Sequence, residues 1–153
     1  MSRRALIRMS PEEIDAFLAG RHTMNIATIG PDGNIHLVAM WYGFLNGNPA
    51  FATFAKSQKV VNLRRDPRIT ALVETGEVYE ELKGVEIVGR GVIHEDPETK
   101  EAVARSVADR YFDVAAPADL DVVIAGLVNK RVAVEIVPEK FVSWDHTKLG
   151  GVY

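Results

Sequence analysis

The chain has 153 residues and a formal net charge of −3, and 47% of its residues are hydrophobic and 25% are charged. These values are typical of one globular domain, so we predict a single domain over residues 1–153 and exclude disordered and fibrous classes. The chain has no cysteine, which excludes disulfides, a thiolate nucleophile and cysteine-bound metals. The acidic balance argues against a nucleic-acid partner, because such a partner requires a basic surface.

The amino-terminal segment MSRRALIRMSPEE carries arginines separated by a short apolar gap. The gap is too short for the apolar centre of a signal peptide, so nothing directs the chain to export. No apolar run approaches the roughly 18 residues of a membrane-spanning helix. We therefore expect a cytoplasmic protein with no membrane partner.

The first predicted element is a short helix that ends near Ala19. Ser10 suits the N-cap position, Pro11 suits the first helical position, and Glu13 completes a capping box. Gly20 then supplies a stop signal. Both ends of this helix are therefore specified by the local sequence.

Three strands are predicted to follow this helix as an antiparallel meander. Strand-forming residues mark each of them, and residues 30–34 form a turn rich in glycine and proline between the first two. Asn46 and Gly47 favour the positive φ angles of a tight hairpin turn before the third strand. The predicted strands span residues 23–29, 35–44 and 50–54.

The remaining chain is predicted to add three helices and three strands. Pro67 prevents the first of these helices from continuing beyond Asp66. Strands arrive in runs rather than alternating with helices, which favours a mainly β (α+β) fold: an antiparallel barrel of six strands with peripheral helices, rather than a doubly wound parallel sheet. The predicted helices span residues 57–66, 97–112 and 120–128, and the strands 69–73, 85–93 and 132–137.

A candidate phosphate site lies at the start of the predicted helix 57–66. Lys56 and Lys59 lie where the helix dipole is already positive, so an anion would relieve a local electrostatic conflict. The Ser57 hydroxyl, free backbone N–H groups and the two ammonium groups together suit a phosphate. Asn62 follows Lys59 by three residues on the same helix face. The alternative interpretation is a basic helix face in water.

The second predicted strand is a candidate wall for a planar ring system. Its apolar bulk and polar tips suit such a wall, although most strands of this kind are simply core. His36 belongs to the same strand, and a lone histidine there is more often a structural residue than a ligand. The candidate wall residues are Val38, Ala39, Met40 and Trp41.

No motif in the sequence supplies a catalytic side chain. There is no glycine-rich dinucleotide loop, no nucleotide-binding P-loop and no G-x-S-x-G serine elbow. The four histidines show no metal-ligand spacing, so no metal site is predicted. Near the C-terminus, Trp144 stands before polar residues, which favours docking of this segment on its own subunit or on a partner.

Several runs of the sequence resemble the pyridoxamine 5′-phosphate oxidase-like split-barrel family. The closest resemblance is to its actinobacterial F420-dependent branch, the flavin/deazaflavin oxidoreductase group B. The lysine-to-proline run is the most specific piece of the match. The runs are A-T-I-G-P-D-G at 27–33, H-L-V-A-M-W-Y at 36–42, K-S-Q-K-V-V-N-L-R-R-D-P-R at 56–68, N-K-R-V at 129–132 and S-W-D-H-T-K-L-G at 143–150.

The resemblance implies a split-barrel homodimer whose cofactor lies in a cleft between the subunits. It implies that the second strand lines the tricyclic ring, and that basic residues around the helix after the third strand hold the phosphate. It also implies that aromatic residues of the other subunit close the pocket, with Tyr79 and Trp144 as candidates. The positions that match the phosphate-binding residues are Lys56, Ser57, Lys59 and Asn62.

The resemblance further implies an oxidoreductase that binds coenzyme F420 and transfers a hydride from the reduced deazaflavin to an electrophilic small molecule, such as an activated double bond. The cofactor would carry the hydride, so no catalytic side chain is assigned. Asp145 and His146 do not reproduce the arginine-and-histidine pattern of vitamin B6 oxidases, which argues against pyridoxamine phosphate as the substrate.

Two alternatives stay open. One is an FMN-dependent oxidoreductase of the same family, and the other is a non-catalytic flavin- or deazaflavin-binding protein. F420 carries a longer acidic tail than FMN, so additional cations such as Arg64 and Arg65 would favour F420.

Overall fold

A computed structural model describes residues 2–113 and 117–151 of the chain. Seven strands form one antiparallel sheet in the order β2-β1-β5-β6-β7-β4-β3. The strands are β1 (Met24–Ile29), β2 (Ile35–Met40), β3 (Gly43–Leu45), β4 (Asn48–Phe54), β5 (Arg68–Thr75), β6 (Lys83–His94) and β7 (Arg131–Asp145). The helices are α1 (Arg3–Leu6), α2 (Pro11–Ala19), α3 (Gln58–Arg65), α4 (Pro97–Tyr111) and α5 (Pro117–Val128), with 3₁₀ turns η1 (Tyr79–Glu81) and η2 (His146–Leu149).

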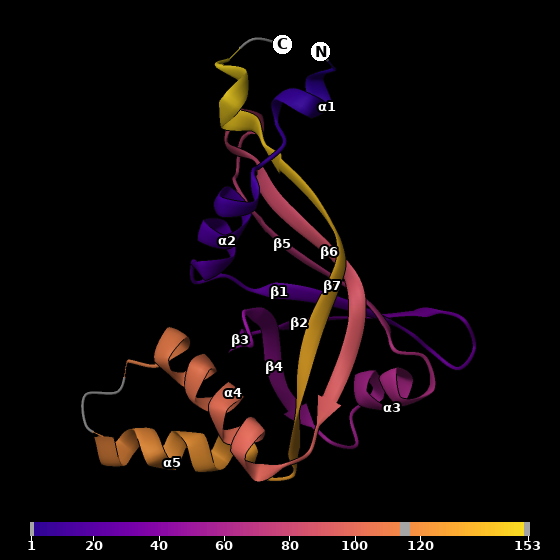
Figure 1. Ribbon diagram of the computed structural model, residues 1–153, viewed down its shortest axis with the longest axis vertical. Helices are drawn as coiled ribbons and strands as arrows, with labels where there is room; N and C mark the ends of the chain where they lie inside the picture. Colours follow the sequence, from indigo (N-terminus) through magenta and orange to yellow (C-terminus); the bar gives the residue numbers. More distant parts are fainter. Residues whose placement is uncertain (1, 114–116, 152–153) are drawn as a thin grey trace.

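The sheet curls into a barrel because its two edges are joined by a very short link. The edge strands β2 and β3 are separated in the chain only by Trp41 and Tyr42, so the two edges must lie close together. Helices surround this curled sheet (Figure 1). The predicted antiparallel α+β barrel with peripheral helices is therefore confirmed, with seven strands in place of six because the predicted strand 35–44 is broken.

The predicted meander is confirmed in its two strand pairings, β1 with β2 and β3 with β4, but wrong in treating residues 35–44 as one strand, because β2 and β3 lie at opposite edges of the sheet. β2 pairs with β1, but β4 pairs with β3 and β7, so β2 and β4 lie in separate parts of the sheet. The break has a clear cause: Tyr42 is fully buried and its hydroxyl donates to the Leu18 carbonyl at 2.5 Å. The hairpin turn itself is confirmed, since Asn46 and Gly47 have φ values of 53° and 77°.

The ends of α2 are fixed as the sequence predicts. The Ser10 hydroxyl accepts from the Glu13 backbone N–H at 3.2 Å, and the Glu13 carboxylate accepts from the Ser10 N–H at 2.6 Å. At the other end, the Arg110 guanidinium of α4 donates to the carbonyls of Ala19 and Gly20. This arginine satisfies carbonyls that the helix itself cannot pair, and it ties α2 to α4.

The upper part of the molecule is an arm built from β5, β6 and β7, with α1 and η2 at its tip (Figure 1). β7 continues to Asp145, beyond the predicted end at 137, so the segment containing Trp144 is a strand. Pro138 obscures this strand in the sequence, because proline breaks a regular ladder. In the structure Pro138 pairs with Gly89 at a register shift in the ladder.

One apolar core fills the barrel and extends under α2. Ile26, Phe51 and Val134 are fully buried from three different strands. Within the part of the chain that the structure describes, no helix is long and apolar enough to cross a membrane.

Candidate functional site

The start of α3 presents unpaired backbone donors. Ser57 is its N-cap residue, yet the Ser57 side chain makes no capping hydrogen bond. The N–H groups of Val60 and Val61 both donate to the Ser57 carbonyl. Among the described residues, the N–H groups of Gln58 and Lys59 have no acceptor, so two donors and the positive end of the helix dipole remain available.

Two cations lie close to this helix end without a counter-charge. Lys59 is 8% exposed, and burial together with the nearby Arg131 lowers the pKa of its ammonium group. The Arg131 Nε is buried and has no hydrogen-bond partner. No carboxylate of the described chain forms an ion pair with either residue. A buried ammonium group beside a half-buried guanidinium whose Nε has no partner is costly, which indicates that an anion completes the site.

The fold brings Arg131 to the end of β4. Arg131 pairs with Phe54 in the β4–β7 ladder, and its guanidinium lies 4.4 Å from the centroid of the Phe54 ring. This stacking fixes the orientation of the guanidinium but consumes none of its hydrogen-bond donors. The donors of Arg131 therefore remain available to a ligand.

A pocket of about 310 Å³ adjoins Arg131. Its size is at the lower end of the range for small-molecule sites, and its wall is mostly apolar with one cation. β2 and the link after it form one side, while β4, α4 and α5 form the other. The lining residues are Thr23, Ala39, Met40, Trp41, Ala52, Val107, Leu127 and Arg131.

Three of the four predicted wall residues thus line one pocket, namely Ala39, Met40 and Trp41. Val38 lies on the same face of β2 as Met40 and, like it, packs against the barrel core, but Val38 does not line the pocket. Trp41 stacks on Tyr111 with ring centroids 5.0 Å apart and planes inclined by 5°. The strand therefore contributes an apolar wall that ends in an aromatic ring.

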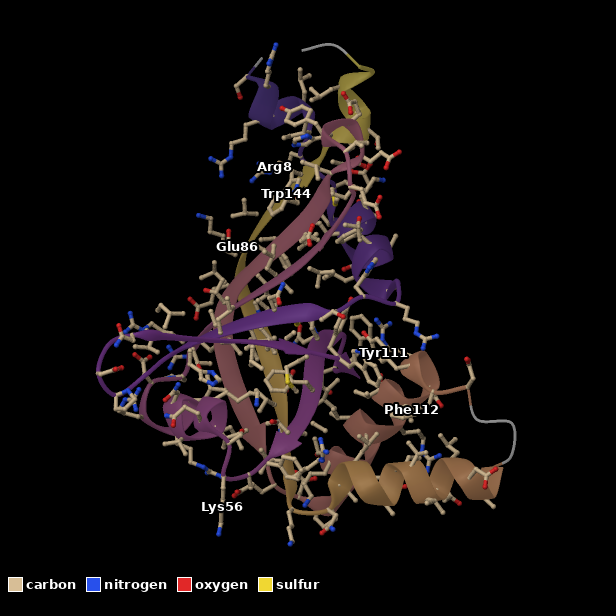
Figure 2. All side chains as sticks on the ribbon, turned by 180° about the vertical axis from the view of Figure 1, so that it is seen from behind. Arg8, Lys56, Glu86, Tyr111, Phe112 and Trp144 are labelled. Atoms are coloured by element: carbon tan, nitrogen blue, oxygen red, sulfur yellow. The ribbon has the colours of Figure 1, made fainter. Side chains whose placement is uncertain are left out.

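The predicted phosphate residues divide into two groups. Ser57 and Lys59 lie at the unpaired helix end, and Lys56 is exposed at the lower end of the molecule (Figure 2). Asn62 is fully buried: its amide donates to the Thr28 hydroxyl at 3.1 Å and accepts from the Gln58 side chain at 2.8 Å. This side chain anchors α3 on β1 and leaves no exposed atom for a ligand.

Tyr79 and Trp144 lie in the arm, away from the pocket of the same chain. Trp144 is near the upper end of the molecule, while Lys56 is at the lower end (Figure 2). Tyr79 contacts His146, whose Nδ1 lies 2.8 Å from the Tyr79 carbonyl oxygen. One chain therefore does not bring these two aromatic residues to the pocket.

Arg131 is a site residue that was not predicted from the sequence. It lies in the N-K-R-V run at 129–132, which is one of the runs that resemble the family, so this match could have indicated it. Arg64 and Arg65, in contrast, are engaged: Arg64 forms an ion pair with Glu95 at 2.7 Å, and Arg65 donates to the Ile29 carbonyl.

A second polar cluster on β7 is structural. Glu135 is 6% exposed and accepts hydrogen bonds from Asn48 at 2.8 Å and from His94 at 2.9 Å. Burial alone would raise the pKa of Glu135, but these hydrogen bonds lower it overall. The carboxylate therefore joins the β3–β4 hairpin to the end of β6.

Comparisons with known proteins agree with this geometry. A family model described as pyridoxamine 5′-phosphate oxidase matches residues 10–145. A comparison with curated protein sequences finds no match. Among solved structures, the conserved hypothetical protein Rv2991 from Mycobacterium tuberculosis is 45% identical with a TM-score of 0.91, and the alignment covers 100% of this chain and 95% of that one.

Two further structures share this fold. A protein described as an F420 reductase is 25% identical with a TM-score of 0.65, over 86% of this chain and 98% of that one. The heme storage protein HutZ from Vibrio cholerae is 16% identical with a TM-score of 0.67, over 90% of this chain and 96% of that one.

Proposed function

The chain belongs to the pyridoxamine 5′-phosphate oxidase family, and we propose that it is a cytoplasmic oxidoreductase that binds coenzyme F420. In this proposal a hydride passes from the reduced deazaflavin to an electrophilic small molecule, such as one with an activated double bond. The observation that carries the proposal is the buried Lys59 of α3 next to the half-buried Arg131 of β7, whose Nε has no hydrogen-bond partner.

The cation pair is suited to the phosphate of the cofactor. Lys59 and Arg131 supply charge, the Ser57 hydroxyl and the N–H groups of Gln58 and Lys59 supply hydrogen bonds, and the helix dipole adds to both. No carboxylate of the described chain competes for these donors. Each charge-assisted hydrogen bond contributes about 1.5–3 kcal/mol.

The adjoining pocket is suited to the ring system. Ala39 and Ala52 are small, so a flat group can approach the strands closely, and Met40 and Trp41 complete an apolar wall. F420, when bound, supplies the hydride chemistry. The residues of this chain bind the cofactor, orient it and exclude water, which agrees with the lack of an assigned acid or base.

The choice of F420 over FMN draws support from one relative. The F420 reductase is 25% identical to this chain over most of both lengths. Lys59 and Arg131 suit the phosphate of either cofactor, so an FMN-dependent enzyme of the same family is the alternative.

We propose that a second copy of the chain completes the site. The side chains of Ile35 and Leu37 on β2 are 64% and 67% exposed, and no described element of this chain covers them. A partner that covers this strand face would also lie next to Trp41 at the pocket mouth. Tyr79 and Trp144 of such a partner are the candidates for closing the pocket.

Titration with F420 and with FMN tests the proposal. We expect F420 to bind at micromolar concentration, and Lys59→Ala or Arg131→Gln to weaken binding by about tenfold to a hundredfold. Arg64→Gln is the matched control, because it removes a cation of the same helix whose charge is already paired with Glu95. Failure to bind either cofactor would refute the proposal, and tight binding of FMN alone would favour the FMN-dependent alternative.

A further inference from the structure

Trp41 differs from the other exposed apolar side chains because aromatic rings hold it on two sides. Its side chain is 48% exposed, yet it stacks on Tyr111 with centroids 5.0 Å apart and planes 5° from parallel. Phe112 meets it edge to face at 5.6 Å and 87°. The indole is therefore held in one orientation while about half of its surface remains open to solvent.

The ring beneath Trp41 is itself firmly held. Tyr111 is 6% exposed, and its hydroxyl donates to the His22 carbonyl at 2.5 Å. Its own carbonyl accepts from the Arg21 guanidinium at 2.8 Å. Tyr111 and Phe112 stand together at the end of α4, on one side of the molecule (Figure 2). They form a rigid support rather than a loose apolar contact.

From this geometry we infer that Tyr111 and Phe112 are positioning residues that present the indole of Trp41 as a stacking surface for a planar conjugated ring. The inference rests on the proposed function and adds to it the shape of the bound group and the residues that select it. Trp41 lines the same pocket as Arg131, so one pocket offers a flat aromatic surface and a cation to the same ligand.

The chemistry of the indole defines the class of ring. Indole is electron-rich, so its face favours planar, electron-poor rings, and offset stacking contributes beyond the apolar area that is buried. Two sources supply such a ring in the proposed reaction: the cofactor and a conjugated electrophilic acceptor. Both satisfy the inference, and affinity measurements separate them.

The first test compares cofactors with their phosphate-free chromophores, using the whole chain of 153 residues. The ligands are FMN and riboflavin, and F420 and its deazaflavin chromophore without phosphate. If the cofactor ring stacks on Trp41, Trp41→Leu raises the dissociation constants of both members of a pair by about threefold to tenfold. Lys59→Ala weakens only the phosphate-bearing members. Trp41→Phe keeps an aromatic face and restores most of the affinity.

If the acceptor ring stacks on Trp41 instead, the cofactor affinities stay unchanged in Trp41→Leu. The KM for a planar quinone, menadione, then rises by a similar factor while kcat stays the same. Val122→Ala is the control, because Val122 is 73% exposed on α5 and does not line the pocket.

The positioning role of Phe112 is tested by measuring how freely the indole of Trp41 moves. In a Trp144→Phe background Trp41 is the single tryptophan, since the chain has two. Phe112→Leu should then speed the decay of its fluorescence anisotropy and raise the same dissociation constant or KM by about twofold to threefold. A fold defect alone would not produce both changes in a protein with an unchanged melting temperature.

The outcomes separate this inference from the proposed function. If the wild-type protein binds the rings and Trp41→Leu alters neither affinity nor KM, the stacking surface is overturned and the proposed cofactor site stands. If the phosphate adds no affinity over the bare chromophore while Trp41→Leu weakens the binding of both, the proposed phosphate site at Lys59 and Arg131 is refuted and the stacking surface stands. If the protein binds none of these rings, both are refuted.

Discussion

The barrel end and the arm of this molecule use their cations in opposite ways. In the arm, Lys148 lies 2.6 Å from Glu13 and Lys83 lies 3.0 Å from Asp145, so each lysine has a carboxylate. At the barrel end, Lys59 and the Nε of Arg131 are buried, and neither residue pairs with a carboxylate of the described chain. The comparison teaches that a cation indicates a ligand site only where it is buried and the protein itself provides no carboxylate to pair with it.

The largest expected effect is that a substitution of Lys59 changes cofactor affinity and folding stability in opposite directions. Lys59→Met removes a buried charge that lies near Arg131, so it should raise the free energy of unfolding of the ligand-free protein by about 1 kcal/mol. The same change should weaken cofactor binding by about 1.5–3 kcal/mol. Urea unfolding and cofactor titration measure the two effects.

Lys83→Met in the arm is the matched control for this variant. It removes the partner of Asp145, so it should lower the unfolding free energy by about 1 kcal/mol or less. If Lys59→Met lowers the free energy of unfolding as Lys83→Met does, Lys59 is not an unpaired cation that destabilises the ligand-free protein, and the two regions do not differ.

The next effect concerns packing in the arm. Gly84 lies opposite Trp144, and a Cβ atom at Gly84 would lie 2.1 Å from Cζ2 of the indole. Gly84→Ala should therefore destabilise the protein by about 1–3 kcal/mol, because the ring has to move. Thermal unfolding measures this loss. Gly84→Ala should weaken cofactor binding less than Lys59→Met does. A larger loss of affinity in Gly84→Ala would mean that the arm contributes more to binding than the cations do.

The smallest effect is a pH dependence. Folding lowers the pKa of Lys59, because burial and Arg131 disfavour its charged form. Above the lowered pKa the folded protein binds fewer protons than the unfolded chain, so the contribution of Lys59 to stability should rise with pH up to the ordinary lysine range. Cofactor affinity should fall over the same pH range, because the neutral amine of Lys59 attracts the phosphate less than the ammonium group does. Lys59→Met should show neither trend, and titrations at several pH values compare the two proteins.

Local features of the fold were predictable from the sequence, and distant pairings were not. The Ser10–Glu13 cap and the Asn46–Gly47 turn each depend on residues at most four positions apart. The pairing of β4 with β7 joins segments about eighty residues apart, and no local pattern specifies it. The meander prediction failed at Trp41 and Tyr42, where the strand expected over 35–44 breaks into β2 and β3 at opposite edges of the sheet.

The candidate site divides in the same way. Lys56, Ser57 and Lys59 were predicted because they share one helix start, where charge and dipole can be read from the sequence. Arg131 reaches them only through the β4–β7 ladder. The contact of Trp41 with Tyr111 likewise depends on how α4 packs against the barrel, which the strand pattern does not contain.

The position of β7 in the sheet has a consequence for folding on the ribosome. β7 is the last strand of the described chain, and it lies between β4 and β6. Until it emerges, the earlier strands carry unpaired edges that invite association with other chains. Arg131, the first residue of β7, arrives at the same moment. The chain thus acquires its continuous sheet and its cation pair in a single late event, so a ligand that binds the pair should also stabilise the newly completed sheet.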